Sequence, residues 1–229
     1  MFFWDPTYIL VLIGAGICLL ASARVKNTFH KYAKMRSSKG LTGREVAEQL
    51  LRQNGLYDVQ VEHVAGELKD HYDPKSKTVR LSDSTYNSTS VAAVGVAAHE
   101  CGHAMQHATG YHPITIRGAL VPVVNLTSMA AWPIILIGLF IGGESAVFII
   151  NIGILLFSTV VLFHLITLPV EFNASSRAIH LLDQGRFLEG EELQASKKVL
   201  QAAALTYVAS AAAMILQLLR LVLLRNRRR

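Results

Sequence analysis

Long apolar stretches separated by polar segments dominate the hydrophobic pattern of the chain. Residues 8–23, 119–142, 145–170 and 201–219 contain no Asp, Glu, Lys or Arg, and the last stretch is rich in alanine. A helix that crosses a bilayer needs about 20 apolar residues. The second and third stretches are therefore long enough to cross with some tilt. The first reaches that length only if the aromatic residues 2–4 extend it at the membrane interface.

The segment after the first apolar stretch is strongly basic. Residues 24–44 hold seven lysines and arginines and no acidic residue. Because basic loops stay on the cytoplasmic side, this pattern predicts a cytoplasmic segment and an N-terminus on the outside. The basic residues follow the apolar stretch rather than precede it, so we expect an uncleaved anchor and not a cleaved signal peptide.

These assignments predict a multi-pass protein of the cell membrane in five parts. The parts are a membrane anchor (1–23), a cytoplasmic domain (24–118), a transmembrane hairpin (119–170), a cytoplasmic helix (171–200) and a C-terminal membrane or interfacial helix with a basic tail (201–229). The hairpin is expected to turn at Gly143-Glu144. The side of the tail is left open, because a fourth crossing would place its arginines outside, against the charge rule.

Inside the cytoplasmic domain the pattern changes to short amphipathic elements. Thr42 and Glu45 form a capping box that opens a helix, which we expect to end near Asn54-Gly55. Alternation and helical spacing predict a strand at 59–64, a turn at 73–77, a strand at 78–81 and a helix at 91–107. The predicted fold class is mainly α, with multi-pass membrane helices and a small α+β domain.

Composition narrows the choice of protein class. Hydrophobic residues make up 52% of the 229 residues and charged residues only 17%, against about 25% charged in ordinary soluble domains. A wholly soluble or a disordered chain is therefore excluded. The net charge of +6 is interpreted as membrane topology, because the chain has no phosphate-binding loop and no basic stripe interleaved with aromatics. We expect a lipid bilayer as partner and no nucleic acid; the oligomeric state is undetermined.

One predicted helix carries the residues of a metal site. In His99-Glu100-Cys101-Gly102-His103 the two histidines are four residues apart, so they share one helical face. Both imidazoles can then bind one Zn²⁺ ion. Glu100 lies beside that face, where it can act as the catalytic base and take a proton from a zinc-bound water. Gly102 is expected to leave room over the metal face.

A catalytic zinc ion needs a third protein ligand and one open position. Glu171 is the strongest candidate, because the hairpin before it returns the chain to the side that it left. Alternatively, Glu171 is only a helix N-terminal charge after Pro169. His107 is also near in sequence, but a straight helix places it about 12 Å from His99, too far for one ion to bind both. Three histidines remain as other candidates for the third ligand: His71, His112 and His164.

The segments 99–103 and 170–174 together resemble the YugP-type membrane zinc metallopeptidases, which are gluzincins related to HtpX. The resemblance covers nearly the whole chain. It implies a zincin-like catalytic domain and a zinc-dependent endopeptidase that cleaves membrane-associated or unfolded proteins. His99, His103 and Glu171 would be the zinc ligands and Glu100 the general base. The wider group has an aspartate four residues after the glutamate ligand, where this chain has Ser175.

Several alternatives remain at this point. The zinc site could be structural, in a membrane scaffold or adaptor without proteolytic activity, or it could hydrolyse a substrate other than a peptide. Arg177 could support the site or contact a substrate oxyanion, or it could be a solvated arginine. The strand Thr78–Leu81 could be an edge strand that pairs with an extended substrate, or it could serve packing alone.

Overall fold

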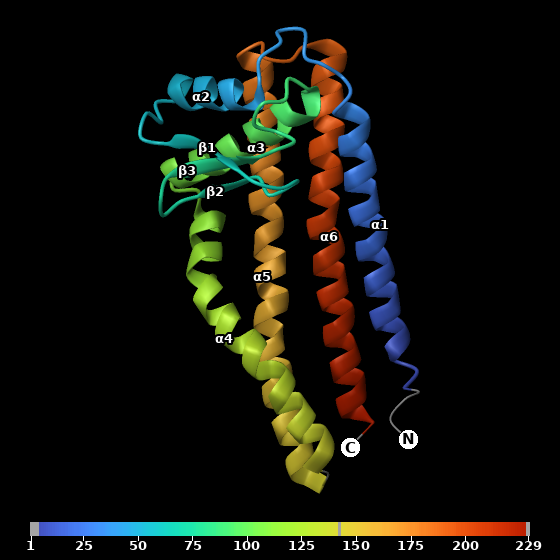
Figure 1. Cartoon of the computed structure of the whole chain (residues 1–229). Helices are drawn as coiled ribbons and strands as arrows, with labels where there is room; N and C mark the ends of the chain where they lie inside the picture. The colour runs from blue at the N-terminus through green and yellow to red at the C-terminus, as the bar shows by residue number, and fades with distance from the viewer. Residues whose placement is uncertain (1–4, 142, 228–229) are drawn as a thin grey trace. The chain divides into compact units, whose positions relative to one another are not determined.

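The computed structural model describes residues 5–141 and 143–227. The aromatic residues 2–4 and the arginines 228 and 229 lie outside the described residues. Within them the chain is mainly helical, with six helices and one three-stranded sheet (Figure 1). The elements are α1 (Tyr8–Tyr32), α2 (Gly43–Gln53), β1 (Gln60–Val64), β2 (His71–Asp73), β3 (Thr78–Ser82), α3 (Val91–Ala108), α4 (His112–Ile141), α5 (Gly143–Gln184) and α6 (Gly190–Asn226).

The chain divides into two compact units. The first, which we call the helical unit, consists of residues up to Ser22, Thr115–Pro169 and the residues from Thr206 onward. The second, the mixed unit, consists of Ala23–Ile114 and Val170–Leu205. The long helices α1, α5 and α6 contribute residues to both units. The sheet, α2 and α3 lie in the mixed unit alone.

Among the described residues, four helices are long and apolar enough to cross a membrane: α1, α4, α5 and α6. In the most apolar 18-residue stretch of each helix, at most 28% of the stretch is buried inside the protein. Apolar side chains that face outward in this number are suited to lipid rather than to water. The apolar stretch at 201–219, whose crossing was undecided from the sequence, is part of such a helix.

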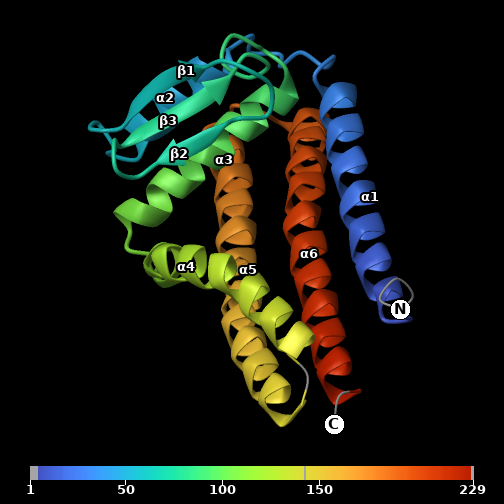
Figure 2. The same cartoon turned by 60° about the horizontal axis from the view of Figure 1, so that its bottom comes forward.

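Apolar contacts and a pair of hydroxyls join α4, α5 and α6 within the helical unit. Ala131, Ile135, Phe157 and Leu221 belong to a buried cluster to which α4, α5 and α6 contribute. The hydroxyls of Thr127 and Thr159 lie 2.6 Å apart and join α4 to α5. Helix α6 runs beside α1 in both views (Figures 1 and 2).

Charged residues join the start of α1 to the end of α6. Arg227 donates to the Asp5 carboxylate at 2.8 Å. The Arg220 guanidinium lies over the Tyr8 ring, 4.3 Å from its centroid. These contacts show that α1 and α6 run antiparallel over their length in the helical unit.

The sheet of the mixed unit has the order β1-β3-β2. β3 pairs in parallel with β1 and antiparallel with β2, so that Val79 is the register partner of both Val61 and Tyr72. The interpretation of Thr78–Leu81 as an edge strand is therefore wrong. The alternation of apolar and polar residues along one strand shows which face is buried. The number of neighbouring strands depends on pairing with distant segments.

The other predicted elements between residues 42 and 108 are confirmed. Thr42 caps α2 in a reciprocal capping box with Glu45, and Asn54 ends the helix. The strands at 60–64 and 78–82 and the helix at 91–108 agree with the predicted ranges within two residues. Helix α2 packs on α3, and both helices contact the sheet. The three-residue strand β2 was not predicted, because it is too short to show alternation.

Residues 171–200 differ from the separate helix that the sequence predicted. Helix α5 continues through Pro169 to Gln184, and α6 begins at Gly190. In the intervening connection Arg186 has a φ of 51°, and Gly190 has a φ of 53°, both in the left-handed region. A chain that enters this region leaves the right-handed helix, which separates α5 from α6.

Helix α3 is enclosed on three sides by close packing. Its Cys101 lies against the Ala47 carbonyl of α2, and its Gly95 leaves space only for Ser196 of α6. A Cβ atom on Gly102 would lie 2.7 Å from the carbonyl oxygen of Ala174 on α5. Gly102 therefore makes room for the backbone of α5. The sequence led us to expect room over the metal face at Gly102, and the structure shows that the backbone of Ala174 fills this space.

We expect Gly102→Ala to destabilise the mixed unit, because the added methyl group must displace the backbone of α5. Overpacking of this kind costs about 1–3 kcal/mol of the free energy of unfolding. The loss can be measured by denaturant unfolding of the detergent-solubilised protein. Gly118→Ala on α4 is the matched control, since nothing lies within 4 Å of its Cβ position. Equal stability of the two variants would contradict the assigned role of Gly102.

Candidate metal centre

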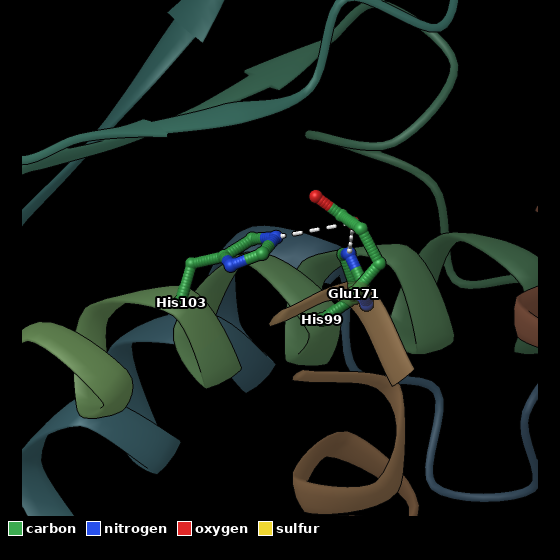
Figure 3. Close-up of side chains that lie close together, drawn as sticks. All are labelled: His99, His103 and Glu171. Carbon is green, nitrogen blue, oxygen red and sulfur yellow. Dashed lines mark ion pairs between the residues drawn. The ribbon is translucent and has the colours of Figure 1, made fainter. Parts of the chain in front are cut away.

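Three side chains from two helices converge in the mixed unit. His99 and His103, one turn apart on α3, direct their rings toward the carboxylate of Glu171 on α5 (Figure 3). The Oε2 atom of Glu171 lies 3.4 Å from Nε2 of His99 and 3.5 Å from Nε2 of His103. The Glu171 side chain is only 3% exposed. These are the same three residues that the sequence proposed as ligands.

The donor set fits a zinc ion. One ligand atom from each of the three residues lies within 4.8 Å of the others. Ligands about 2.1 Å from a tetrahedral zinc ion are about 3.4 Å apart, and this agrees with the two nitrogen–oxygen distances. Two imidazoles and one carboxylate also form the usual donor set of catalytic zinc sites, which keep the fourth position open.

The second nitrogen of His99 is held by Ser175. The Ser175 Oγ lies 3.2 Å from Nδ1 of His99. Ser175 is four residues after Glu171, so both side chains leave the same face of α5. The serine thus occupies the position at which the resemblance led us to expect an aspartate. It supplies a neutral partner that can accept the Nδ1 proton and leave the Nε2 lone pair for a metal.

The second nitrogen of His103 is held by Gln106, which sequence reasoning missed. Gln106 is fully buried on α3, and its Oε1 lies 3.0 Å from Nδ1 of His103. Its amide nitrogen donates to the Val170 carbonyl at 2.8 Å and to Asn173 Oδ1 at 3.0 Å. The available signal was a glutamine three residues after His103 on the same apolar helix. Only the approach of α5 shows what its amide nitrogen contacts.

Arg177 extends this network away from the metal cluster. Its Nε donates to Asn173 Oδ1 at 2.8 Å, and its guanidinium lies 5.9 Å from the centre of the Tyr111 ring. Of the interpretations considered from the sequence, support of the site agrees with these contacts. Among the described residues, these hydrogen bonds connect Arg177 to His103 through Asn173 and Gln106.

Glu100 is buried beside the two histidines, with 7% of the residue exposed. Burial raises the pKa of the Glu100 carboxyl, while the neighbouring His99 and His103 oppose this rise. A carboxyl group whose pKa is raised holds a proton more readily than one in water. This property is required of a group that accepts a proton and then passes it on.

Among the described residues, the other candidates for the third ligand do not belong to the cluster of His99, His103 and Glu171. Nδ1 of His71 lies 2.8 Å from the Lys69 carbonyl, and Nδ1 of His112 lies 3.1 Å from the Gly110 carbonyl. The ring of His107 packs against Tyr72. Cys101 is fully buried, and burial raises the pKa of its thiol, so this side chain packs in the core.

Comparison with known proteins agrees with this donor set. Residues 7–226 match the family described as "Putative neutral zinc metallopeptidase". A curated relative from Bacillus subtilis (strain 168), described as "Putative membrane protease YugP", is 46% identical over 215 residues, which cover 94% of each chain. No solved structure matches the chain significantly.

We expect Gln106→Leu to weaken zinc binding by about 10- to 100-fold, as is usual when the partner of a ligating histidine is lost. The change frees Nδ1 of His103 and leaves the buried Val170 carbonyl without the amide donor. Affinity can be measured by competition with a zinc chelator. Ser175→Ala removes a single hydrogen bond and should have the smaller effect. Wild-type affinity in a folded Gln106→Leu protein would contradict the role of Gln106.

Proposed function

Because the chain belongs to the family of putative neutral zinc metallopeptidases, we propose that it is an integral membrane, zinc-dependent endopeptidase. The observation that carries the proposal is the distance from Oε2 of Glu171 to each Nε2 atom, which agrees with tetrahedral zinc ligands. His99, His103 and Glu171 are the ligands, and Glu100 is the general base. The sheet with α2 and α3 is the zincin-like catalytic domain.

Each ligand is oriented by its own surroundings. Ser175 and Gln106 accept the Nδ1 protons of His99 and His103, so that both Nε2 lone pairs face Glu171. A zinc ion at these atoms supplies a Lewis acid that polarises the scissile carbonyl and lowers the pKa of water to about 7. Burial of Glu171 keeps bulk water from competing for its carboxylate.

Glu100 carries out the proton transfers. Its carboxylate takes a proton from the attacking water as the peptide carbonyl becomes tetrahedral. It then gives this proton to the amine that leaves when the C–N bond breaks. Glu100 is buried and directly follows His99 on α3. It therefore lies close to the ligands without being one of them.

The substrate is an extended segment of a membrane-associated or unfolded protein. The relative's description as a membrane protease supports this class of substrate. With β3 in the centre of the sheet, β2 becomes the edge strand next to α3, and its Tyr72 touches His107 of that helix. We assign substrate pairing by strand addition to β2 instead of β3.

The chain crosses the membrane four times, with the mixed unit in the cytoplasm. The basic residues 24–44 support this orientation. The antiparallel contacts of Asp5 with Arg227 and of Tyr8 with Arg220 support a full crossing by α6, with both termini outside. Pairing with Asp5 and stacking on Tyr8 offset part of the cost of arginines on that side.

We expect the purified protein to contain about one zinc ion per chain, as is usual for a site with three protein ligands. His103→Ala and Glu171→Gln should both lose it, as measured by metal mass spectrometry. His71→Ala and His112→Ala are controls of the same kind and should keep it. If a folded Glu171→Gln protein kept its full zinc content, the third ligand would have to be a residue other than Glu171.

We expect Glu100→Gln to keep its zinc and to lose cleavage of a fluorescently labelled unfolded protein by about 100-fold or more. The amide has nearly the shape of the carboxylate but cannot accept the proton. Glu67→Gln changes an exposed glutamate and serves as the matched control.

Measuring zinc content and cleavage together separates peptide hydrolysis from a structural zinc site. A structural site does not need Glu100, so wild-type protein with bound zinc but no activity on any peptide would favour the scaffold interpretation. Wild-type cleavage rates in Glu100→Gln would rule out the proposed base.

A further inference from the structure

A cleft of about 700 Å³ lies in the mixed unit between α1, α5 and α6, beside the metal cluster but not part of it. Four cationic side chains line it: Arg24 and Lys31 from α1, and Lys197 and Lys198 from α6. We propose that this cleft binds the phosphate headgroup of an anionic membrane lipid. The proposal does not depend on zinc or on proteolysis.

Helical spacing explains how the three helices line one cleft. Arg24, Thr28 and Lys31 are at positions i, i+4 and i+7 of α1, which lie on one helical face. The same spacing recurs on the two other helices, with Phe172, Ser175, Ser176 and Ile179 on α5, and Lys198, Gln201, Ala202 and Leu205 on α6. The cations thus share the cleft with hydrogen-bonding and apolar side chains.

The positive charge of the cleft is not compensated within it. No carboxylate lines the cleft in the part of the chain that the structure describes. Lys31 lies near the Tyr32 ring, 5.3 Å from its centre, and no ion pair of Arg24, Lys197 or Lys198 occurs among the described residues. Glu192 of α6 does not line the cleft, and its carboxylate accepts a hydrogen bond from the Ser38 backbone N–H at 2.8 Å.

The cations lie where apolar stretches meet polar ones. Arg24 directly follows the uncharged residues 8–23, and Lys197 and Lys198 precede the uncharged residues 201–219. In membrane-spanning helices such positions lie at the level of the lipid headgroups. Basic pockets between helices on the cytoplasmic side are suited to anionic headgroups.

The side chains that line the cleft are better suited to an amphiphile than to a free phosphate ion. Thr28 and Gln201 offer hydrogen-bond donors for phosphate oxygens. Phe172 and Leu205, both more than a third exposed, provide an apolar wall for the first carbons of an acyl chain. A free phosphate would use the cations but leave this wall in contact with water.

One side chain connects the cleft with the metal cluster. Ser175 lines the cleft, and its Oγ also holds Nδ1 of His99. A lipid in the cleft would therefore touch the residue that orients one of the proposed ligands. The two sites remain separate, because none of the three ligands lines the cleft.

We would titrate the full-length, detergent-solubilised protein with phosphatidylglycerol and follow the first bound lipid by native mass spectrometry. Lys197→Gln/Lys198→Gln should weaken that binding by roughly 10- to 30-fold, since two charges near the surface are lost. Arg24→Gln/Lys31→Gln removes the other pair and should weaken it to a similar extent. Circular dichroism checks that each variant is folded.

Lys26→Gln/Lys34→Gln is the matched control, because these exposed lysines lie outside the cleft and the loss of charge is the same. The proposal is upheld if this control binds as the wild type does and if phosphatidylcholine with the same acyl chains binds more weakly. If all three double variants weakened lipid binding equally, binding would depend on the overall charge of the protein and not on the cleft. That result would overturn the proposal. Displacement of the lipid by millimolar inorganic phosphate would overturn the choice of a lipid.

Discussion

The close crossing of α3 and α5 is the constraint on which the mixed unit depends. Gly102 lacks a Cβ, so the backbone of α5 approaches α3 until the Ala174 carbonyl fills that space. Glu171 and Ser175 lie three residues before and one residue after this contact. The crossing therefore brings the carboxylate to both Nε2 atoms and the hydroxyl to one Nδ1 atom. Because a helix is rigid over one turn, a single short contact positions both groups.

Polar residues around this crossing satisfy one another in a defined order. Gln106 uses its carbonyl for His103 and its amino group for α5, through Val170 and Asn173. An unsatisfied amide at this depth would cost about 1–3 kcal/mol, so the helices are held in the register that satisfies it. Arg177 adds a cation that donates to the same Asn173 Oδ1 atom as Gln106. The network orients the imidazoles and joins the two helices at the same time.

Helix α5 serves two sites with neighbouring residues. Glu171 faces the metal cluster and Phe172 the cationic cleft, while Ser175 takes part in both. This arrangement agrees with a protein that acts at a membrane, because the cleft lies at the polar ends of two apolar helices. It also gives a physical reason for a serine four residues after Glu171. A short hydroxyl reaches His99 and adds no negative charge to a cleft lined by four cations.

The sequence by itself determined the elements whose signals are local. The capping box of Thr42, the helix with His99 and His103, and the apolar helices depend on spacing within one segment, and the structure contains them. It also singled out Glu171, on donor chemistry and on the length of the hairpin. Only the tertiary structure decided that β3 is central, that Gly102 accommodates α5, and that Gln106 and Ser175 hold the imidazoles. These features depend on contacts between residues up to 76 positions apart, as between Ser175 and His99, and no periodicity within one segment encodes such a distance.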